Sequence, residues 1–198
     1  IIVDDGSTDN FLKKKIEFKK NNLKIIHHKK NLGKCKAMLT GVKNAKKNNI
    51  CIIDGDGQNP PYEAKKLMNF WMSINKTEKQ FALVCGNRIK RQDSMSKKIS
   101  SKVANKIRKI MLDDDCDDTA CALKVFSKDD YLKLKYFRNM HRFLPALFKI
   151  NSGKIFNVSV DDRKRTKGIS KYSFHNRFWI GILDLINVWL MVLKRRKK

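Results

Sequence analysis

Short runs of apolar, β-branched residues alternate with longer helical patterns through the first half of the chain. The runs predict strands at Ile1–Val3, Leu23–His27, Ile50–Ile53 and Phe81–Cys85. The segments between them predict helices at Phe11–Lys20, Lys34–Lys47 and Glu63–Ile74. Parallel strands need crossover connections, and the crossover helices cover both faces of the sheet. The sequence therefore predicts an α/β, Rossmann-like fold with a mostly parallel central sheet.

The second half of the chain is less regular and ends in an apolar segment. It predicts a long helix at Ser96–Leu112, an acidic turn after it, and a short apolar run at Ile155–Val160. As a helix, Phe178–Leu193 would be about 24 Å long, short of a hydrocarbon core of about 30 Å. Because a basic tail follows, the segment predicts an amphipathic helix on an anionic membrane surface. An ordinary packing helix is the alternative. We expect one main domain at 1–172 and a membrane-interface segment at 173–198.

The charge of the chain narrows the choice of partners. The 198 residues include 45 Lys+Arg and 19 Asp+Glu, which gives a formal net charge of +26. Such a charge favours nucleic acid, an anionic membrane surface or phosphorylated small molecules as partners. Much of the lysine is scattered, however, so a solvated lysine-rich surface explains the charge equally well. The sequence has no zinc-ligand spacing, no RNP-like aromatic signature and no recognition helix, so we expect no nucleic-acid partner.

The cysteines and histidines do not indicate a metal site or disulfide bonds. The chain has 5 cysteines without a C-x-x-C pair, and most of them lie in apolar runs. This pattern predicts buried, reduced thiols, not a disulfide framework or a zinc site. His27 and His28 end a predicted strand beside lysines, so we expect them at the surface.

Two acidic segments follow predicted strands. In the first, Asp4 and Asp5 end a strand, Gly6 permits a tight turn, and the polar residues after it can cap a helix. Ligands of open α/β sheets bind beyond the carboxyl ends of the strands. Carboxylates there suit ribose hydroxyls or base N–H groups, although a plain strand–turn–helix cap explains the same residues.

In the second acidic segment, Asp54 and Asp56 follow the strand Ile50–Ile53. Carboxylate oxygens are hard ligands that suit Mg²⁺ or Mn²⁺, and Gln58 could add a neutral oxygen. Such an ion keeps several waters and accepts phosphate oxygens, so it would join the protein to a diphosphate. A D-x-D pair alone is common in surface loops. A D-x-D pair that directly follows an apolar strand, with another acidic strand end earlier in the sequence, is a stronger indication of a metal site.

Taken together, these segments resemble glycosyltransferase family 2. The resemblance rests on Asp4–Asp9, Asn31–Lys34 with Ala37 and Gly41, and Asp54–Pro61. Later segments resemble the dolichol-phosphate mannose synthase type: Gly86–Arg88, Asp118–Lys124, His141–Leu147 and Arg165–Tyr172. That group transfers a sugar from a nucleotide donor to a polyprenyl phosphate. The resemblance runs in order from residue 1 to about residue 190.

The resemblance implies an enzyme with a GT-A fold, for which residues 1–172 would be the catalytic domain. The donor would be GDP-mannose or a UDP-hexose, the acceptor dolichyl or undecaprenyl phosphate, and the cofactor Mg²⁺ or Mn²⁺. By the resemblance, the donor would bind to Asp4, Asp5 and Asp54, and the metal ion to Asp54, Asp56 and Gln58. Acceptor-phosphate binding falls to Arg88, Lys97, Ser101, Ser170 and Lys171. Catalysis falls to Asp56, Arg88 and Arg165. Asp118 could be a base, but a structural hydrogen bond fits it better. The resemblance gives His141 a local structural or acceptor-side role.

Three expectations complete the hypothesis. The enzyme would lie on the cytoplasmic face of a membrane as a peripheral protein. In doubly wound sheets of order 3-2-1-4 the first strand lies centrally. If Ile1 opens the second strand, the domain is N-terminally incomplete and its sheet lacks the first strand. An inactive or partial glycosyltransferase is therefore one alternative function, and a basic nucleic-acid-binding protein is another.

Overall fold

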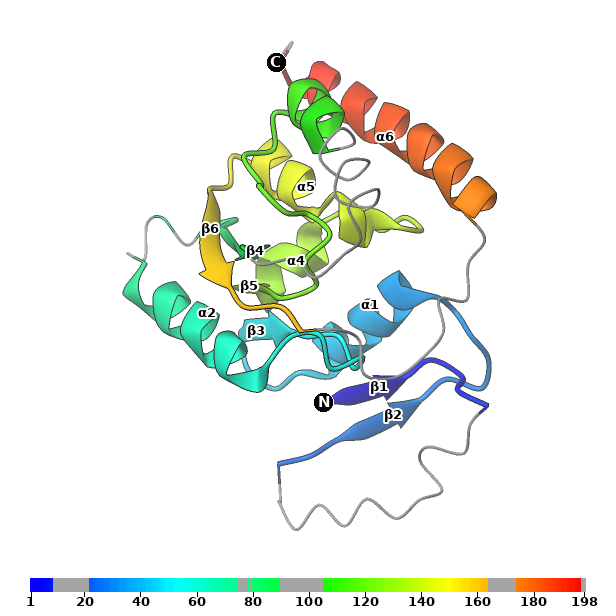
Figure 1. The fold of residues 1–198 in the computed structure, drawn as a ribbon, viewed down its shortest axis with the longest axis vertical. Coiled ribbons are helices and arrows are strands. Elements are labelled where there is room, and N and C mark those ends of the chain that lie inside the picture. Colours follow the sequence, from blue (N-terminus) through cyan, green and yellow to red (C-terminus); the bar gives the residue numbers. More distant parts are fainter. Residues whose placement is uncertain (9–21, 75–77, 79, 90–104, 164–173, 197–198) are drawn as a thin grey trace.

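The computed structural model describes residues 1–8, 22–74, 78, 80–89, 105–163 and 174–196, with side chains in the last segment described for 181–195 (Figure 1). The strands are β1 (Ile2–Asp4), β2 (Ile25–His27), β3 (Asn49–Ile52), β4 (Leu83–Arg88), β5 (Lys124–Ser127) and β6 (Ile155–Val160). The helices are α1 (Lys34–Asn44), α2 (Pro61–Ser73), α4 (Lys128–Lys133), the 3-10 helix η2 (Met140–Arg142), α5 (Leu144–Ile150) and α6 (Phe174–Arg196). Residues 105–112 are also helical.

The strands form two sheets. β1 pairs with β2 in parallel, and the second sheet has the order β3-β5-β4-β6. β5 is antiparallel to both β3 and β4, whereas β6 is parallel to β4, so three of these four strands point the same way. The predicted α/β fold is confirmed, with a sheet that is mixed. The sequence did not predict β5, because its apolar run is only Val125–Phe126 and a helix follows at once.

Helices cover both faces of the second sheet. Alternate residues of β4 and β5 point to opposite faces: Leu83 and Phe126 pack with α4 and α5, whereas Val84 and Val125 pack with α2. Figure 1 shows α2 on one side of the sheet and α4 and α5 on the other. Each large side chain buried in this way contributes about 1.5–3 kcal/mol. All five cysteines are free and four of them are buried, as the sequence predicted.

A cavity of about 390 Å³ separates β1 from β3. It is lined by both strands and by α1, and Lys34 and Asp54 lie at its wall. α1 packs closely on β1, because a Cβ atom at Gly41 would lie 3.4 Å from the Val3 side chain. The cavity lies where the sequence predicted an incomplete sheet, and it adjoins the second acidic segment.

The helix α6 packs on the rest of the protein and also exposes apolar residues. Its Val188 and Val192 are buried against Leu112, Phe143 and Ala146. Its opposite face exposes Leu183, Ile186 and Leu190. The buried face is that of a packing helix, and contact of the exposed face with a membrane stays a prediction. Within the described parts of the chain, no helix combines the length and apolarity that crossing a bilayer requires.

Candidate functional site

Asp5 joins the end of β1 to the loop that precedes α1. Its Oδ1 accepts a hydrogen bond from Leu32 N at 2.9 Å, and its Oδ2 accepts one from Gly33 N at 2.7 Å. His28 Nδ1 lies 2.7 Å from the same Oδ1, and His28 Nε2 lies 3.0 Å from Thr40 Oγ1 on α1. Since a carboxylate only accepts, Nδ1 is the donor. The expected surface position is therefore wrong for His28, whose side chain is 9% exposed, and right for His27.

The hydrogen bonds of Asp5 make its carboxylate acidic. Burial alone would raise the pKa of Asp5, but the hydrogen bonds from His28, Leu32 and Gly33 outweigh burial and lower it below the ordinary value of 3.8. The carboxylate therefore stabilises the fold at neutral pH. That stabilisation is complete above 3.8 and is lost as the pH falls through the lowered pKa.

We expect Asp5→Asn to lower the free energy of unfolding by about 1–3 kcal/mol near pH 7, since it weakens several charge-assisted hydrogen bonds. The difference in free energy of unfolding should narrow as the pH falls below 3.8, because Asp5 of the unchanged protein then becomes protonated, first in its unfolded state and at lower pH in its folded state. Urea unfolding at several pH values measures the difference. Asp129→Asn, at an exposed position on α4, is the control. A difference that does not change with pH would contradict this account.

Lys34 connects the acidic segment after β3 with the acidic segment after β1. It is the first residue of α1 and directly follows Gly33, which Asp5 holds. Its Nζ lies 2.6 Å from Asp54 Oδ2, and the Asp54 side chain is 33% exposed. The acidic ends of β1 and β3 are thus connected through the segment 32–34. The sequence offered one signal for this role, a lysine directly after a glycine, and that signal is too common to be used alone.

The loop after β3 is held at several points. Asp56 Oδ1 accepts a hydrogen bond from Gln58 N at 3.1 Å, and Gly57 has a φ of 76°, which favours glycine. Gln58 O accepts one from Arg163 N at 2.9 Å, just beyond β6. Pro61 then opens α2. The loop therefore has a fixed path between the strand and the helix.

The donor atoms of this loop fit a hard divalent cation with an incomplete protein shell. Asp54, Asp56 and Gln58 offer oxygens only, which suit Mg²⁺ or Mn²⁺. Among the described residues, no group of three or more His, Cys, Asp or Glu side chains could hold a metal. An ion at the D-x-D pair would thus complete its shell with water and phosphate oxygens, as Mg²⁺ commonly does. It would also compete with the Lys34 ammonium for Asp54.

Arg88, at the end of β4, is paired with buried carboxylates. Its Nε lies 2.6 Å from Asp118 Oδ2 and its NH2 lies 3.1 Å from Asp118 Oδ1. Its NH1 lies 3.8 Å from Asp162 Oδ2. The side chains of Arg88 and Asp118 are 10% and 5% exposed. Burial opposes the charge of Arg88, but the hydrogen bonds and charge of Asp118 outweigh it and raise the pKa of the arginine. Asp118 therefore has the structural partner that its sequence context favoured.

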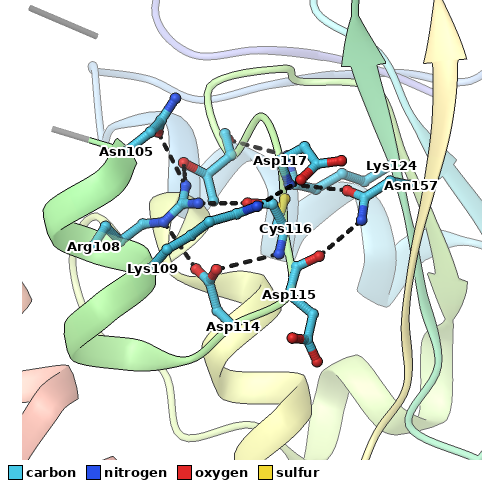
Figure 2. Close-up of polar contacts among 10 residues, drawn as sticks. Asn105, Arg108, Lys109, Asp114, Asp115, Cys116, Asp117, Lys124 and Asn157 are labelled. Atoms are coloured by element: carbon cyan, nitrogen blue, oxygen red, sulfur yellow. Dashed lines mark hydrogen bonds and ion pairs between the residues drawn. The ribbon is translucent and has the colours of Figure 1, made fainter. Parts of the chain in front are cut away.

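A buried arginine organises the acidic segment that leads to Asp118. Figure 2 shows Arg108 of the helix 105–112 pointing into this segment, with Nε 3.0 Å from Asp114 Oδ2 and NH2 2.6 Å from Cys116 O. Burial raises the pKa of Asp114, and the charge of Arg108 partly offsets that rise. The sequence predicted an acidic turn here, but not that it folds around a cation.

Two further contacts fix the same segment from outside. Lys109 Nζ lies 2.6 Å from Asp117 Oδ1 at the surface. Asn157 of β6 accepts from Asp117 N at 3.0 Å and donates to Asp115 O at 2.8 Å, as drawn in Figure 2. The backbone that presents Asp118 to Arg88 is therefore held by β6 and by the helix 105–112.

The remaining predicted site residues are not in the described part of the chain. They are Lys97, Ser101, Arg165, Ser170 and Lys171. The predicted helix Phe11–Lys20 also lies outside it, and the predicted helix Ser96–Leu112 is described from residue 105 onward. The acidic side chains of the predicted site are thus placed, together with Gln58 and Arg88.

Solved structures resemble this fold. Glucosyl-3-phosphoglycerate synthase from Mycobacterium tuberculosis matches 98% of the chain, with a TM-score of 0.60 in its complex with uridine diphosphate and 0.64 in its complex with phosphoglyceric acid. The identity is 14% in both cases, and the match covers 67% and 68% of those chains. This likeness concerns the fold.

Sequence comparison identifies the family. A dodecaprenyl-phosphate galacturonate synthase of Rhizobium johnstonii is 31% identical over 194 residues, which are 95% of this chain and 56% of the relative. An undecaprenyl-phosphate 4-deoxy-4-formamido-L-arabinose transferase of Photorhabdus laumondii is 28% identical over 177 residues, 88% of this chain and 53% of the relative. The chain thus spans about half the length of these curated relatives. Residues 1–135 match the family description "Glycosyl transferase family 2", and the chain belongs to that family.

Proposed function

We propose that this chain transfers a sugar from a nucleotide sugar to a polyprenyl phosphate by a metal-assisted, inverting displacement. The observation that carries the proposal is the contact between Lys34 and Asp54, which joins the two acidic strand ends of a family 2 chain in one place. The printed names of the two relatives, both of which concern a polyprenyl phosphate, support the lipid acceptor. The donor would be GDP-mannose, a UDP-hexose or a nucleotide-linked sugar of the relatives' kinds.

The donor would bind at the acidic strand ends Asp4, Asp5 and Asp54. A carboxylate can accept about four hydrogen bonds. Asp5 already accepts three, from His28, Leu32 and Gly33. It therefore has room for about one more, and most of its work is to hold the loop before α1. The donor diphosphate would lie toward Lys34 and the D-x-D pair.

Asp54, Asp56 and Gln58 would hold the divalent cation. Bound there, Mg²⁺ or Mn²⁺ would neutralise the diphosphate that leaves the sugar. Lys34, whose ammonium lies 2.6 Å from Asp54, would instead be free to pair with a phosphate oxygen of the donor when the cation is held by Asp54. The ion pair between Lys34 and Asp54 would thus keep both groups in position before the donor binds.

The reaction requires charge neutralisation more than it requires a base. A phosphate monoester has a second pKa of about 6, so the acceptor is mostly a dianion near neutral pH. An acceptor oxygen would form a bond to the anomeric carbon as the bond to the donor diphosphate breaks, which inverts that carbon. Repulsion between the two anions must be overcome, and cations around the acceptor do this. We assign this charge neutralisation to Arg88, Lys97, Arg165 and Lys171, and hydrogen bonds to the acceptor phosphate to Ser101 and Ser170.

A transfer assay tests the proposal. Labelled nucleotide sugars would be incubated with a short polyprenyl phosphate, with Mg²⁺, with Mn²⁺, and with a chelator. We expect a lipid-linked product from one donor that depends on the metal. A folded protein that makes no product from any donor would contradict the proposal and favour an inactive or partial enzyme. Metal-independent binding to random DNA, with a steep salt dependence, would favour the nucleic-acid alternative.

The acceptor is embedded in lipid, so the enzyme must reach a membrane. We propose that α6 is the element of the segment 173–198 that contacts an anionic membrane, on the cytoplasmic face. Leu183, Ile186 and Leu190 are exposed on one face of this helix. Lys194 and Arg195 follow them and are exposed as well. An amphipathic helix of this kind lies in the interface, with basic residues near anionic headgroups.

We expect Leu183→Glu/Leu190→Glu to lower binding to anionic vesicles at least about tenfold, because two apolar side chains can no longer enter the interface and two negative charges face the lipid. Co-sedimentation with vesicles measures the bound fraction. Leu132→Glu, at an exposed position on α4, is the matched control and should bind as the unchanged protein does. Equal binding by all three proteins would contradict the assignment of α6 to the membrane.

A further inference from the structure

A buried cysteine and a partly buried histidine that are far apart in the sequence form a pair next to the proposed donor site. Cys35 lies in the first turn of α1 and is 4% exposed. Its Sγ lies 3.0 Å from Nδ1 of His141, in η2, and accepts a hydrogen bond from His141 N at 3.3 Å. Burial raises the pKa of Cys35, so the group is a thiol. A thiol can donate to Nδ1 or accept from it, so the contact holds in either tautomer of the ring.

This pair gives the first turn of α1 a second contact, besides the contact that Asp5 makes just before the helix. Gly33 is held by Asp5 Oδ2, and Cys35 is held by His141. Lys34, between them, extends its ammonium to Asp54 at 2.6 Å. The direction of the Lys34 side chain therefore depends on two anchors, one on each neighbouring residue.

The 3-10 helix η2, which carries His141, is itself held by contacts with the rest of the protein. Asn139, just before η2, has a φ of 67°, and its Nδ2 donates to Asp184 Oδ2 of α6 at 3.0 Å. Met140 is buried in the core that contains Leu144 and Phe148. η2 is thus tied to α6 on one side and to α1 on the other, so His141 has little freedom to move away from Cys35.

We propose that His141 is a positioning residue of the donor site, which acts by binding Cys35 and so setting the direction of Lys34. His141 does not itself contact the sugar or the diphosphate. The inference rests on the proposed function, because it assumes that a nucleoside diphosphate binds near Lys34 and Asp54. It predicts that the loss of this pair weakens donor binding and leaves the chemical step nearly unchanged.

Two variants of Cys35 separate positioning from simple packing. A serine hydroxyl can donate to Nδ1 and accept from His141 N as the thiol does, whereas alanine can do neither. We expect Cys35→Ala to weaken binding of UDP or GDP about tenfold, and Cys35→Ser to stay within about threefold of the unchanged protein. In the transfer assay, Cys35→Ala should raise the KM for the donor and leave kcat within about twofold.

Substitutions at His141 provide an independent measurement. Asparagine places an acceptor near the position of Nδ1, so His141→Asn should bind nucleotide better than His141→Ala. The double variant Cys35→Ala/His141→Ala should bind no more weakly than His141→Ala alone, because the two residues act through one contact. Calorimetry with UDP or GDP and Mn²⁺, without acceptor, gives these affinities even if one variant is poorly stable.

The outcomes distinguish this proposal from the proposed function. If the unchanged protein binds nucleotide but transfers no sugar, the function fails, and the affinities of the variants still decide the role of His141. The positioning role is overturned if Cys35→Ala binds as the unchanged protein does, if Cys35→Ser is as weak as Cys35→Ala, or if only the melting temperature changes. The absence of any nucleotide binding by the unchanged protein would overturn both.

Discussion

Replacement of Asp56 by asparagine is expected to slow sugar transfer by roughly 10²–10³-fold, the usual cost of removing one electrostatic stabiliser of a transition state. Asparagine keeps the size of the side chain and its oxygen, which accepts from Gln58 N in the present loop. The substitution removes only the negative charge. Since the proposed cation would have just two carboxylates from the described part of the protein, either loss halves the charge that binds it.

The metal dependence of the variants is the decisive measurement. Asp54→Asn and Asp56→Asn should both need higher concentrations of Mn²⁺ to reach half of their remaining rate. Asp129→Asn, which changes the charge of the protein equally at an exposed position, should behave as the unchanged protein does. If Asp56→Asn transfers sugar at the normal rate with a normal Mn²⁺ requirement, the proposal that Asp54 and Asp56 bind the metal ion is contradicted.

Replacement of Asp118 by asparagine is expected to lower the free energy of unfolding by about 3–5 kcal/mol. Both side chains of the pair with Arg88 are buried, and the two hydrogen bonds are 2.6 and 3.1 Å long. Removing the carboxylate leaves a buried guanidinium whose remaining charged neighbour, Asp162, is 3.8 Å away. For a chain of this size the melting temperature should fall by about 2–4 °C for each kcal/mol.

Asp117 provides a matched control in the adjacent position. It also pairs with a cation, Lys109, at 2.6 Å, but its side chain is 45% exposed. Exposed ion pairs contribute at most about 1 kcal/mol, so Asp117→Asn should change the melting temperature little. A stable Asp118→Asn protein without transfer activity would instead favour Asp118 as a catalytic base. Thermal unfolding and the transfer assay together distinguish the two roles.

The strands that could be predicted are those with long apolar runs. The predicted strands at Ile50–Ile53 and Phe81–Cys85 correspond to β3 and β4, with bounds displaced by one to three residues. β5, α4 and α5 were not predicted, because their residues show no clear local pattern and they depend on neighbours distant in the sequence. Lys124, for example, opens β5 although it is a buried lysine whose ammonium donates to the carbonyls of Thr119 and Cys121. No local pattern indicates such an environment.

In the candidate site, too, contacts between residues far apart in the sequence could not be predicted. The acidic residues could be predicted, because carboxylates at strand ends are visible in the sequence. The residues that position them could not, since His28 reaches Asp5 and Lys34 reaches Asp54 only after the strands and α1 are packed. The pair of Cys35 and His141 joins residues 106 positions apart. A sequence pattern reports local periodicity, whereas these contacts follow from the tertiary arrangement.

The strand order of the second sheet has a consequence for how the protein is made. β3 has its only described partner in β5, and β4 lies between β5 and β6, so both strands are complete long before their neighbours leave the ribosome. Ser127, the end of β5, follows Arg88, the end of β4, by 39 positions. At about 5–20 residues per second, translation needs roughly 2–8 s to cover that distance. During this interval the nascent chain presents apolar, unpaired strands, and it is then that a chaperone would have the most to protect.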